Sequence, residues 1–288
     1  MQMRRIGSVE VSAVGLGAMP LSTKGNVPEE RAVRTVHAAL DAGVTLIDTA
    51  DAYAPDERTV GHNERLVAAA LRSYGGDTSG VVVATKGGHT REAGGRWGLD
   101  GRPEYIRRAC EASLTALGVE AIGLYQYHRP DPAVPYAETV GALQELRAEG
   151  KIRMIGISNA DVDQIRLTIE VLGHDGLASV QNEFSPRFRS SADELELCTK
   201  EGVAFLPWSP LGGVGSAAAL GDRHAAFAEV AGAHGVSPQR VCIAWILAKS
   251  PVTVPIPGAS RPESVTDSAA AASLELSPDE IARMDATG

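Results

Sequence analysis

Four side chains in this sequence have the types and the spacing of an acid–base site. Short apolar runs lead into Asp48, Lys86 and His128, each of which stands at or just after the end of its run. Tyr53 follows Asp48 by five residues, in the loop after the first of these runs. A carboxylate at the end of a buried strand is costly unless a cation meets it, and Lys86 is a candidate partner. If the runs are parallel strands of one sheet, the four groups meet at one end of it.

Together these groups could protonate an oxyanion as it forms, which is general acid catalysis. Tyrosine is a poor acid at neutral pH because its ordinary pKa is about 10, but a neighbouring ammonium stabilises the phenolate and lowers that pKa. Asp48 would keep Lys86 charged and in place, and His128 could orient a carbonyl oxygen by hydrogen bonding. Taken singly, a structural salt bridge, a loop tyrosine and a satisfied histidine explain these residues as well or better. Their joint placement favours the catalytic interpretation.

Apolar runs alternate with helical patterns along the whole chain. The runs lie near residues 13–18, 44–48, 81–85, 121–127, 152–157, 179–182, 203–207 and 252–256. The helical patterns lie near residues 29–42, 61–73, 103–117, 136–149, 161–173, 190–201, 237–249 and 262–272. Alternating strands and helices predict a parallel sheet, and the count of eight fits a closed (β/α)8 TIM barrel. We therefore expect residues 1–288 to form a single α/β barrel domain with a short N-terminal β-hairpin at residues 3–11.

An α/β barrel carries its active site at the carboxyl ends of its strands. The residues that follow the predicted strands form a ring of polar and aromatic groups above an apolar core. They are Asp48, Lys86, His128, Ser158, Asn159, Gln181, Asn182, Trp208, Ser209 and the segment 258–261. The opposite strand ends show no such enrichment, which places the expected site on one face of the barrel.

The composition limits the classes of partner. Lysine and arginine number 27 against 36 acidic residues, so the formal net charge is −9. An acidic surface argues against nucleic acid or an anionic membrane as a partner. No apolar run approaches the roughly 20 residues of a membrane span, and the N-terminus lacks the apolar core of a secretory signal. Three widely spaced cysteines indicate free thiols, so we expect a cytoplasmic protein.

Seven motifs, in order along nearly the whole chain, resemble the aldo-keto reductase family. They lie at residues 47–53, 84–88, 127–128, 156–159, 181–185, 207–212 and 256–259. The resemblance implies a barrel that reduces aldehydes and ketones to alcohols with a hydride from a nicotinamide cofactor. It implies that Tyr53 is the general acid and that Lys86 lowers the pKa of Tyr53. It also implies that Asp48 pairs with Lys86 and that His128 positions the substrate carbonyl.

The same resemblance assigns residues to the cofactor. Ser158, Asn159 and Gln181 match the positions that hold the nicotinamide carboxamide. Trp208 takes the place of the aromatic side chain that stacks on the nicotinamide ring, and the glycine-rich segment 211–216 resembles the loop over the pyrophosphate. The cofactor-binding residues expected on this basis are Ser158, Asn159, Gln181, Trp208, Ser209, Leu211, Gly213, Gly258, Ser260, Arg261, Asp267 and Ser268.

The phosphate end of the expected cofactor site has support from the residues themselves. Ser260 and Glu263 fit a capping box, with Pro262 in the first turn of a helix. A helix N-terminus beside Arg261 is a site for an anion. The match to the family is weaker here, because Ser264 stands where many members have an arginine for the 2′-phosphate. We therefore favour NADPH and keep NADH as an alternative.

The substrate contacts and the competing functions are less constrained by the sequence. Trp97 and Arg129 are candidate substrate contacts, and the short C-terminal tail predicts an open pocket that accepts a broad range of carbonyl compounds. One alternative is a non-catalytic subunit that senses a bound cofactor, and another is an aldolase that uses Lys86 as a Schiff base. The seven histidines form no ligand-like cluster, so no metal site is expected. The oligomeric state does not follow from the sequence.

Overall fold

A curled parallel sheet forms the core of the protein in a computed structural model that describes residues 1–23, 27–213 and 215–287. Within these residues the sheet has seven strands in the order β11-β10-β9-β8-β5-β4-β3. The strands are β3 (Leu16–Gly17), β4 (Leu46–Asp48), β5 (Val82–Gly87), β8 (Ile122–Tyr127), β9 (Ile152–Ser158), β10 (Leu177–Gln181) and β11 (Ala204–Phe205). All neighbouring pairs are parallel, as the alternation of strands and helices predicts.

The expected eighth strand near residues 252–256 closes the barrel without forming a regular strand. The segment lies between β11 and β3 and is bridged to both. Toward β3, the carbonyls of Pro255 and Pro257 accept hydrogen bonds from the N–H groups of Gly15 and Gly17, at 2.9 and 3.0 Å. Proline has no N–H, so this side of the segment cannot donate in return and its ladder is half formed. The barrel prediction is confirmed, with its last strand reduced to isolated bridges.

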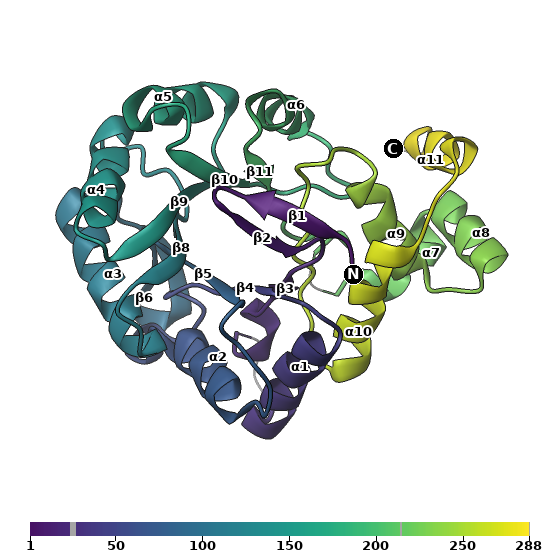
Figure 1. Cartoon of the computed structure of the whole chain (residues 1–288), viewed down its shortest axis with the longest axis horizontal. Helices are drawn as coiled ribbons and strands as arrows, with labels where there is room; N and C mark the ends of the chain where they lie inside the picture. The colour runs from purple at the N-terminus through teal and green to yellow at the C-terminus, as the bar shows by residue number, and fades with distance from the viewer. Residues whose placement is uncertain (24–26, 214, 288) are drawn as a thin grey trace.

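Helices surround the sheet on its outer face (Figure 1). The eight helical patterns of the sequence are present as α1 (Glu29–Asp41), α2 (His62–Ser73), α3 (Pro103–Leu117), α4 (Tyr136–Ala148), α5 (Val162–Leu172), α6 (Ala192–Glu201), α9 (Pro238–Leu247) and α10 (Pro262–Ala270). Three further helices, α7 (Leu220–Arg223), α8 (Ala225–His234) and α11 (Pro278–Asp285), lie together at one side of the barrel. No helix in the described ranges is both long and apolar enough to cross a membrane.

The N-terminal hairpin seals the amino end of the barrel. It pairs β1 (Met3–Ile6) with β2 (Val9–Ser12) in antiparallel register, as predicted, and turns at Gly7, whose φ of +52° favours glycine. Ile6 and Val11 are fully buried in one apolar cluster with the inward-facing residues of the strands. Figure 1 shows the hairpin lying across the middle of the ring of strands. The open end is therefore the carboxyl end, where a barrel carries its site.

A second hairpin stands at that carboxyl end, directly after β5. It pairs β6 (His89–Glu92) with β7 (Arg96–Leu99) through the short turn η3 (Ala93–Gly95). The sequence predicted only a long segment over the pocket at residues 87–102, and this hairpin gives it a regular structure.

Candidate active site

The ammonium group of Lys86 is the centre of the acid–base site. It donates hydrogen bonds to Asp48 Oδ1 at 2.6 Å, to the carbonyl oxygen of Thr49 at 2.8 Å and to the hydroxyl of Tyr53 at 3.3 Å. Lys86 is fully buried, while Asp48 is 2% exposed and Tyr53 is 9% exposed. The strands β4 and β5 are neighbours, which brings the carboxylate and the ammonium to the same end of the sheet. All three donors of the ammonium are used, and they link the carboxylate to the phenol.

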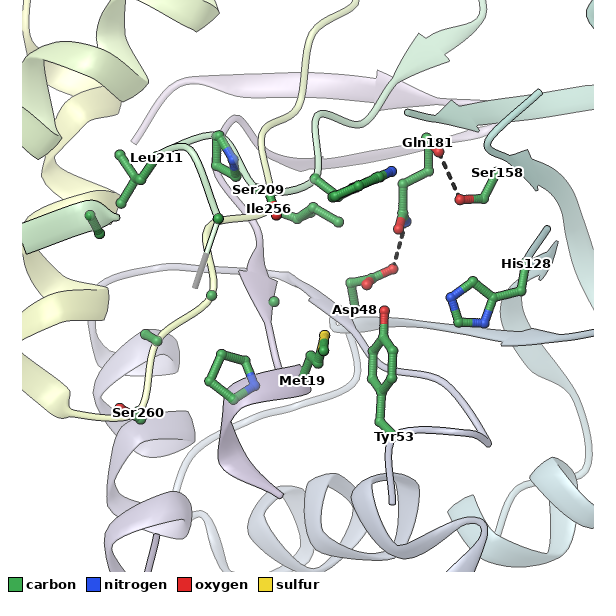
Figure 2. A pocket seen from close by; sticks show the side chains of 18 of the residues that line it. Met19, Asp48, Tyr53, His128, Ser158, Gln181, Ser209, Leu211, Ile256 and Ser260 are labelled. Atoms are coloured by element: carbon green, nitrogen blue, oxygen red, sulfur yellow. Dashed lines mark hydrogen bonds between the residues drawn. The ribbon is translucent and has the colours of Figure 1, made fainter. Parts of the chain in front are cut away.

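Two glutamine side chains satisfy the other carboxylate oxygen of Asp48. Oδ2 accepts a hydrogen bond from Nε2 of Gln181 at 2.8 Å and another from Nε2 of Gln126 at 3.3 Å. Figure 2 shows Gln181 directed at Asp48. Sequence analysis missed Gln126, although a signal was present. Gln126 is on β8 and His128 directly follows the strand. The two are two residues apart, so strand alternation turns both toward the inside of the barrel.

Burial raises the pKa of Tyr53 overall, although Lys86 acts to lower it as expected. Burial is the largest cause and raises the pKa above 10, while the nearby Lys86 ammonium acts in the lowering direction without outweighing burial. For Lys86, burial acts to lower the pKa, but Asp48 and Tyr53 together raise it, so that the net shift is upward. The pocket therefore holds a charged lysine beside a phenol that stays protonated at neutral pH.

His128 lies beside Tyr53 as a neutral imidazole. The two rings meet edge to face with their centres 5.7 Å apart. Burial is the main cause that lowers the pKa of His128 well below 6.5, followed by the charge of Lys86. A neutral imidazole has one N–H to donate and carries no charge that would compete with Lys86. His128 can therefore donate one hydrogen bond to an oxygen atom of a ligand.

The β6–β7 hairpin supplies an aromatic wall next to His128. The ring of His89 stacks on Trp97 with centres 4.4 Å apart, and it meets the ring of His128 edge to face with centres 4.9 Å apart. The guanidinium of Arg91 lies 3.9 Å from the centre of the Trp97 ring. Arg91 also donates hydrogen bonds to the carbonyl of Ala54 at 2.7 and 3.0 Å. Because Ala54 follows Tyr53 directly, the wall is joined to the loop that carries Tyr53.

These groups open onto one cavity of about 440 Å³. The predicted residues that line it are Asp48, Tyr53, Trp97, His128, Arg129, Ser158, Asn159, Gln181, Trp208, Ser209, Leu211, Gly213, Gly258, Ser260 and Arg261. In Figure 2, Tyr53 and His128 lie at one side of the cavity and Leu211 and Ser260 at the other. Gly17, Met19, Pro20, His89, Pro210, Ala217 and Ile256 also line it and were not assigned to the site from the sequence. Val214 of the predicted glycine-rich loop lies outside the described residues.

Polar side chains lock the strand ends between these two sides. Ser158 Oγ donates to the carbonyl of Gln181 at 2.7 Å, as Figure 2 shows. The Asn159 amide donates to the carbonyl of His128 at 2.9 Å and to Ser158 Oγ at 3.0 Å. Asn159 and Ser209 have φ values of +56° and +50°, the only positive values outside glycine among the described residues. Such strain is typical of functional sites.

The predicted capping box at Ser260 is wrong. The helix α10 begins at Pro262, and its N-cap is Arg261, with no side-chain cap within the described part of the chain. Arg261 has extended dihedral angles, so the helix starts one residue later than the box requires, and Glu263 stands one position too early to close it. The uncapped N-terminus and the Arg261 side chain face the cavity together with Ser264, a combination suited to an anion.

Asp267 and Ser268, predicted at the adenine end, are not among the described residues that line the cavity. The Asp267 carboxylate accepts hydrogen bonds from Nε and Nη2 of Arg240, at 3.0 and 2.7 Å. This pairing ties α10 to α9 and uses the carboxylate for packing. Ser268 is 6% exposed on α10.

The fold and the site define the chain as an α/β-barrel enzyme, and comparison with known proteins identifies its family. The model of the aldo/keto reductase family matches residues 13–288. An uncharacterised oxidoreductase of Schizosaccharomyces pombe is 32% identical over 288 residues, which cover 99% of this chain and 89% of that protein. The chain belongs to the aldo/keto reductase family and is an NAD(P)H-dependent oxidoreductase.

Solved structures of the same family have the same fold. A thermostable aldo-keto reductase crystallised with the inhibitor epalrestat superposes with a TM-score of 0.84 at 27% identity, covering 100% of both chains. An aldo/keto reductase from Klebsiella pneumoniae in complex with NADP and acetate gives a TM-score of 0.81 at 28% identity, covering 99% of this chain and 94% of that one.

Proposed function

We propose that this enzyme reduces small aldehydes and ketones to alcohols with NADPH, and that Tyr53 is the general acid. The observation that carries the proposal is the hydroxyl of Tyr53, held by the buried Lys86–Asp48 pair where the cavity begins. A phenol in this position can give its proton to a carbonyl oxygen as that oxygen becomes negative. When bound, NADPH supplies the hydride that reduces the carbonyl carbon.

The residues present fit a dinucleotide. Trp208 lines the cavity, and its indole Nε1 has no hydrogen-bond partner among the described residues. At the far side, the uncapped start of α10 and Arg261 suit a phosphate. We assign Trp208, Ser158, Asn159 and Gln181 to the nicotinamide end. The NADP complex of the Klebsiella pneumoniae relative supports the same choice of cofactor.

The acid–base residues divide the proton transfer between them. His128 donates its one N–H to the substrate oxygen and holds it near the Tyr53 hydroxyl. Tyr53 then gives its proton to that oxygen, and Lys86 stabilises the phenolate that remains. Asp48 holds Lys86 in the geometry that makes this possible. The high pKa of Tyr53 suits this role, because the acid must still carry its proton when the substrate arrives.

The structure argues against the aldolase alternative. A Schiff base needs a neutral amine that reaches the substrate. Lys86 is fully buried, bonded to Asp48 and Tyr53, and its pKa is raised by these neighbours against the effect of burial. The intact acid–base set likewise favours turnover over a purely sensing subunit.

The test is NADPH consumption with a panel of aldehydes and ketones, with the Tyr53→Phe variant beside the wild type. We expect Tyr53→Phe to retain NADPH affinity and to lose most of its reductase activity. Tyr74→Phe is the matched control, since the Tyr74 hydroxyl bonds Asp41 on the surface away from the cavity. Normal turnover by Tyr53→Phe would show that another group is the acid. Tight NADPH binding without consumption in the wild type would favour a sensor.

A further inference from the structure

The end of the cavity near Tyr53 carries one cation without a counter-ion. Among the described lining residues, the carboxylate and guanidinium groups belong to Asp48, Arg129 and Arg261. Asp48 is paired with Lys86 at 2.6 Å, and Arg261 lies at the opposite end, beside α10. His89 and His128 are neutral at neutral pH, because burial first and neighbouring cations second lower the pKa of each. Arg129 is therefore the net charge that a substrate meets.

Most of the hydrogen-bonding capacity of Arg129 is unused. Its one hydrogen bond within the described residues runs from Nη2 to Asn159 Oδ1 and is long, at 3.3 Å. No described carboxylate lies within 4.0 Å of its guanidinium nitrogens. Burial raises the pKa of Glu183, and the charges of Arg187 and Arg129 act in the opposite direction. A guanidinium has five N–H donors in a planar fork that suits a carboxylate.

Arg91 is a nearby arginine whose hydrogen-bond donors have partners within the protein. Its donors are bonded to the carbonyls of Ala54 and Gly95, its plane lies on Trp97, and it is not one of the lining residues. Arg129, in contrast, is exposed and lines the cavity. His89 and His128, the rings at the substrate end, line the same cavity as Arg129.

We infer that Arg129 binds a carboxylate of the substrate, so that the preferred substrates are small carbonyl compounds that also carry a carboxylate. The inference rests on the proposed reductase function and names its substrate class. Arg129 and His128 both line the same cavity, so one small molecule bound there can reach both side chains. The carbonyl meets His128 and Tyr53, the carboxylate meets Arg129, and the apolar part lies along the wall of His89 and Trp97.

The test compares 4-carboxybenzaldehyde with 4-nitrobenzaldehyde, whose nitro group has a similar shape and no net charge. The ratio of their kcat/KM values is measured for the wild type, Arg129→Met and Arg187→Met. Arg187 is also exposed but is not among the residues that line the cavity, so its variant controls for the loss of one positive charge. Intrinsic differences in aldehyde reactivity cancel when the ratio is compared between variants.

We expect Arg129→Met to lower the carboxyl-to-nitro ratio by about tenfold, the effect of losing one charge-assisted hydrogen bond. Arg187→Met should leave the ratio unchanged. An unchanged ratio in Arg129→Met would overturn the inference. If the ratio is unchanged because the activity falls equally with both aldehydes, Arg129 acts by holding Asn159 and not by binding the carboxylate.

A binding measurement separates this inference from the proposed reaction. Benzoate and nitrobenzene are titrated against tryptophan fluorescence, which Trp97 at the cavity wall should report. Tighter binding of benzoate by the wild type, lost in Arg129→Met, supports the anion site even if neither aldehyde is reduced, in which case the reductase proposal alone fails. Equal affinity of wild type and Arg129→Met for benzoate would overturn the inference.

Discussion

Replacing Asp48 by asparagine should destabilise the barrel strongly, because it leaves the Lys86 ammonium buried without its counter-ion. The pair is joined at 2.6 Å, with the two side chains 0% and 3% exposed. Removing one partner of a buried pair costs about 3–5 kcal/mol of unfolding free energy. At about 2–4 °C per kcal/mol for a chain of this size class, the melting temperature should fall by about 6–20 °C. Gln126 and Gln181 add to the loss, because both donate to Asp48 Oδ2. An asparagine either places an NH2 group at that position, which cannot accept, or turns its oxygen there and away from Lys86.

The assay is thermal unfolding of Asp48→Asn, Lys86→Met and the double variant. The double variant removes both charges and keeps the length of the lysine stem, so it should melt above Asp48→Asn. Glu30→Gln is the control, because Glu30 also bonds Arg34 at 2.6 Å but both side chains are exposed. An exposed pair contributes little, so this variant should melt with the wild type. If Asp48→Asn melts within about 2 °C of the wild type, or if the double variant is no better, the buried charge is not what stabilises this end of the barrel.

Three further predictions follow from the same site and its surroundings. Arg261→Ala should weaken NADPH binding more than NADH binding, measured by fluorescence titration, and equal weakening would remove the 2′-phosphate role. The kcat/KM for reduction should stay level from about pH 5 to about pH 9, because burial, then Arg129 and Arg91, lower the pKa of His89 to about 4, while the pKa of Tyr53 is raised above 10. A break near pH 6.5 would assign an ordinary histidine to the reaction. Burial raises the pKa of Glu64, so above pH 4.5 the folded protein keeps a proton that the unfolded chain loses. The free energy of unfolding of the wild type should therefore fall as the pH rises, and it should fall less in Glu64→Gln. Urea titrations across pH, with the exposed Glu138→Gln as control, check this, and parallel pH curves for wild type and Glu64→Gln would contradict it.

The positions of the acid–base residues could be predicted because they depend on strand ends. Asp48, Lys86 and His128 each follow a visible apolar run, and a parallel sheet brings such ends together. The net shift of the Tyr53 pKa could not be predicted, because it depends on how deeply the phenol is buried, and burial arises from the loops above the barrel. His89 was missed for the same reason, since its role depends on a hairpin whose fold the sequence pattern did not reveal.

Two differences from the predictions came from patterns that fit a motif but not the backbone. Ser260 and Glu263 have the spacing of a capping box, yet the extended conformation of Arg261 moves the helix start by one residue. Pro255 lies in the apolar run at residues 252–256 and Pro257 directly follows it, and each lacks the N–H that a regular ladder needs. In both cases the residue types fit the predicted motif, but the hydrogen-bond geometry of the backbone did not.

The N-terminal hairpin has a consequence for the order in which the chain can fold. Its turn at Gly7 lies against Met154 and Ala178, so closely that a Cβ on Gly7 would come within 3.1 Å of both. The hairpin therefore leaves the ribosome well before these partners and meets them only after synthesis has passed Ala178. Until then the apolar side chains of Ile6 and Val11 have no barrel interior to enter, and contacts so distant in sequence form slowly. The hairpin is thus made early and docks late.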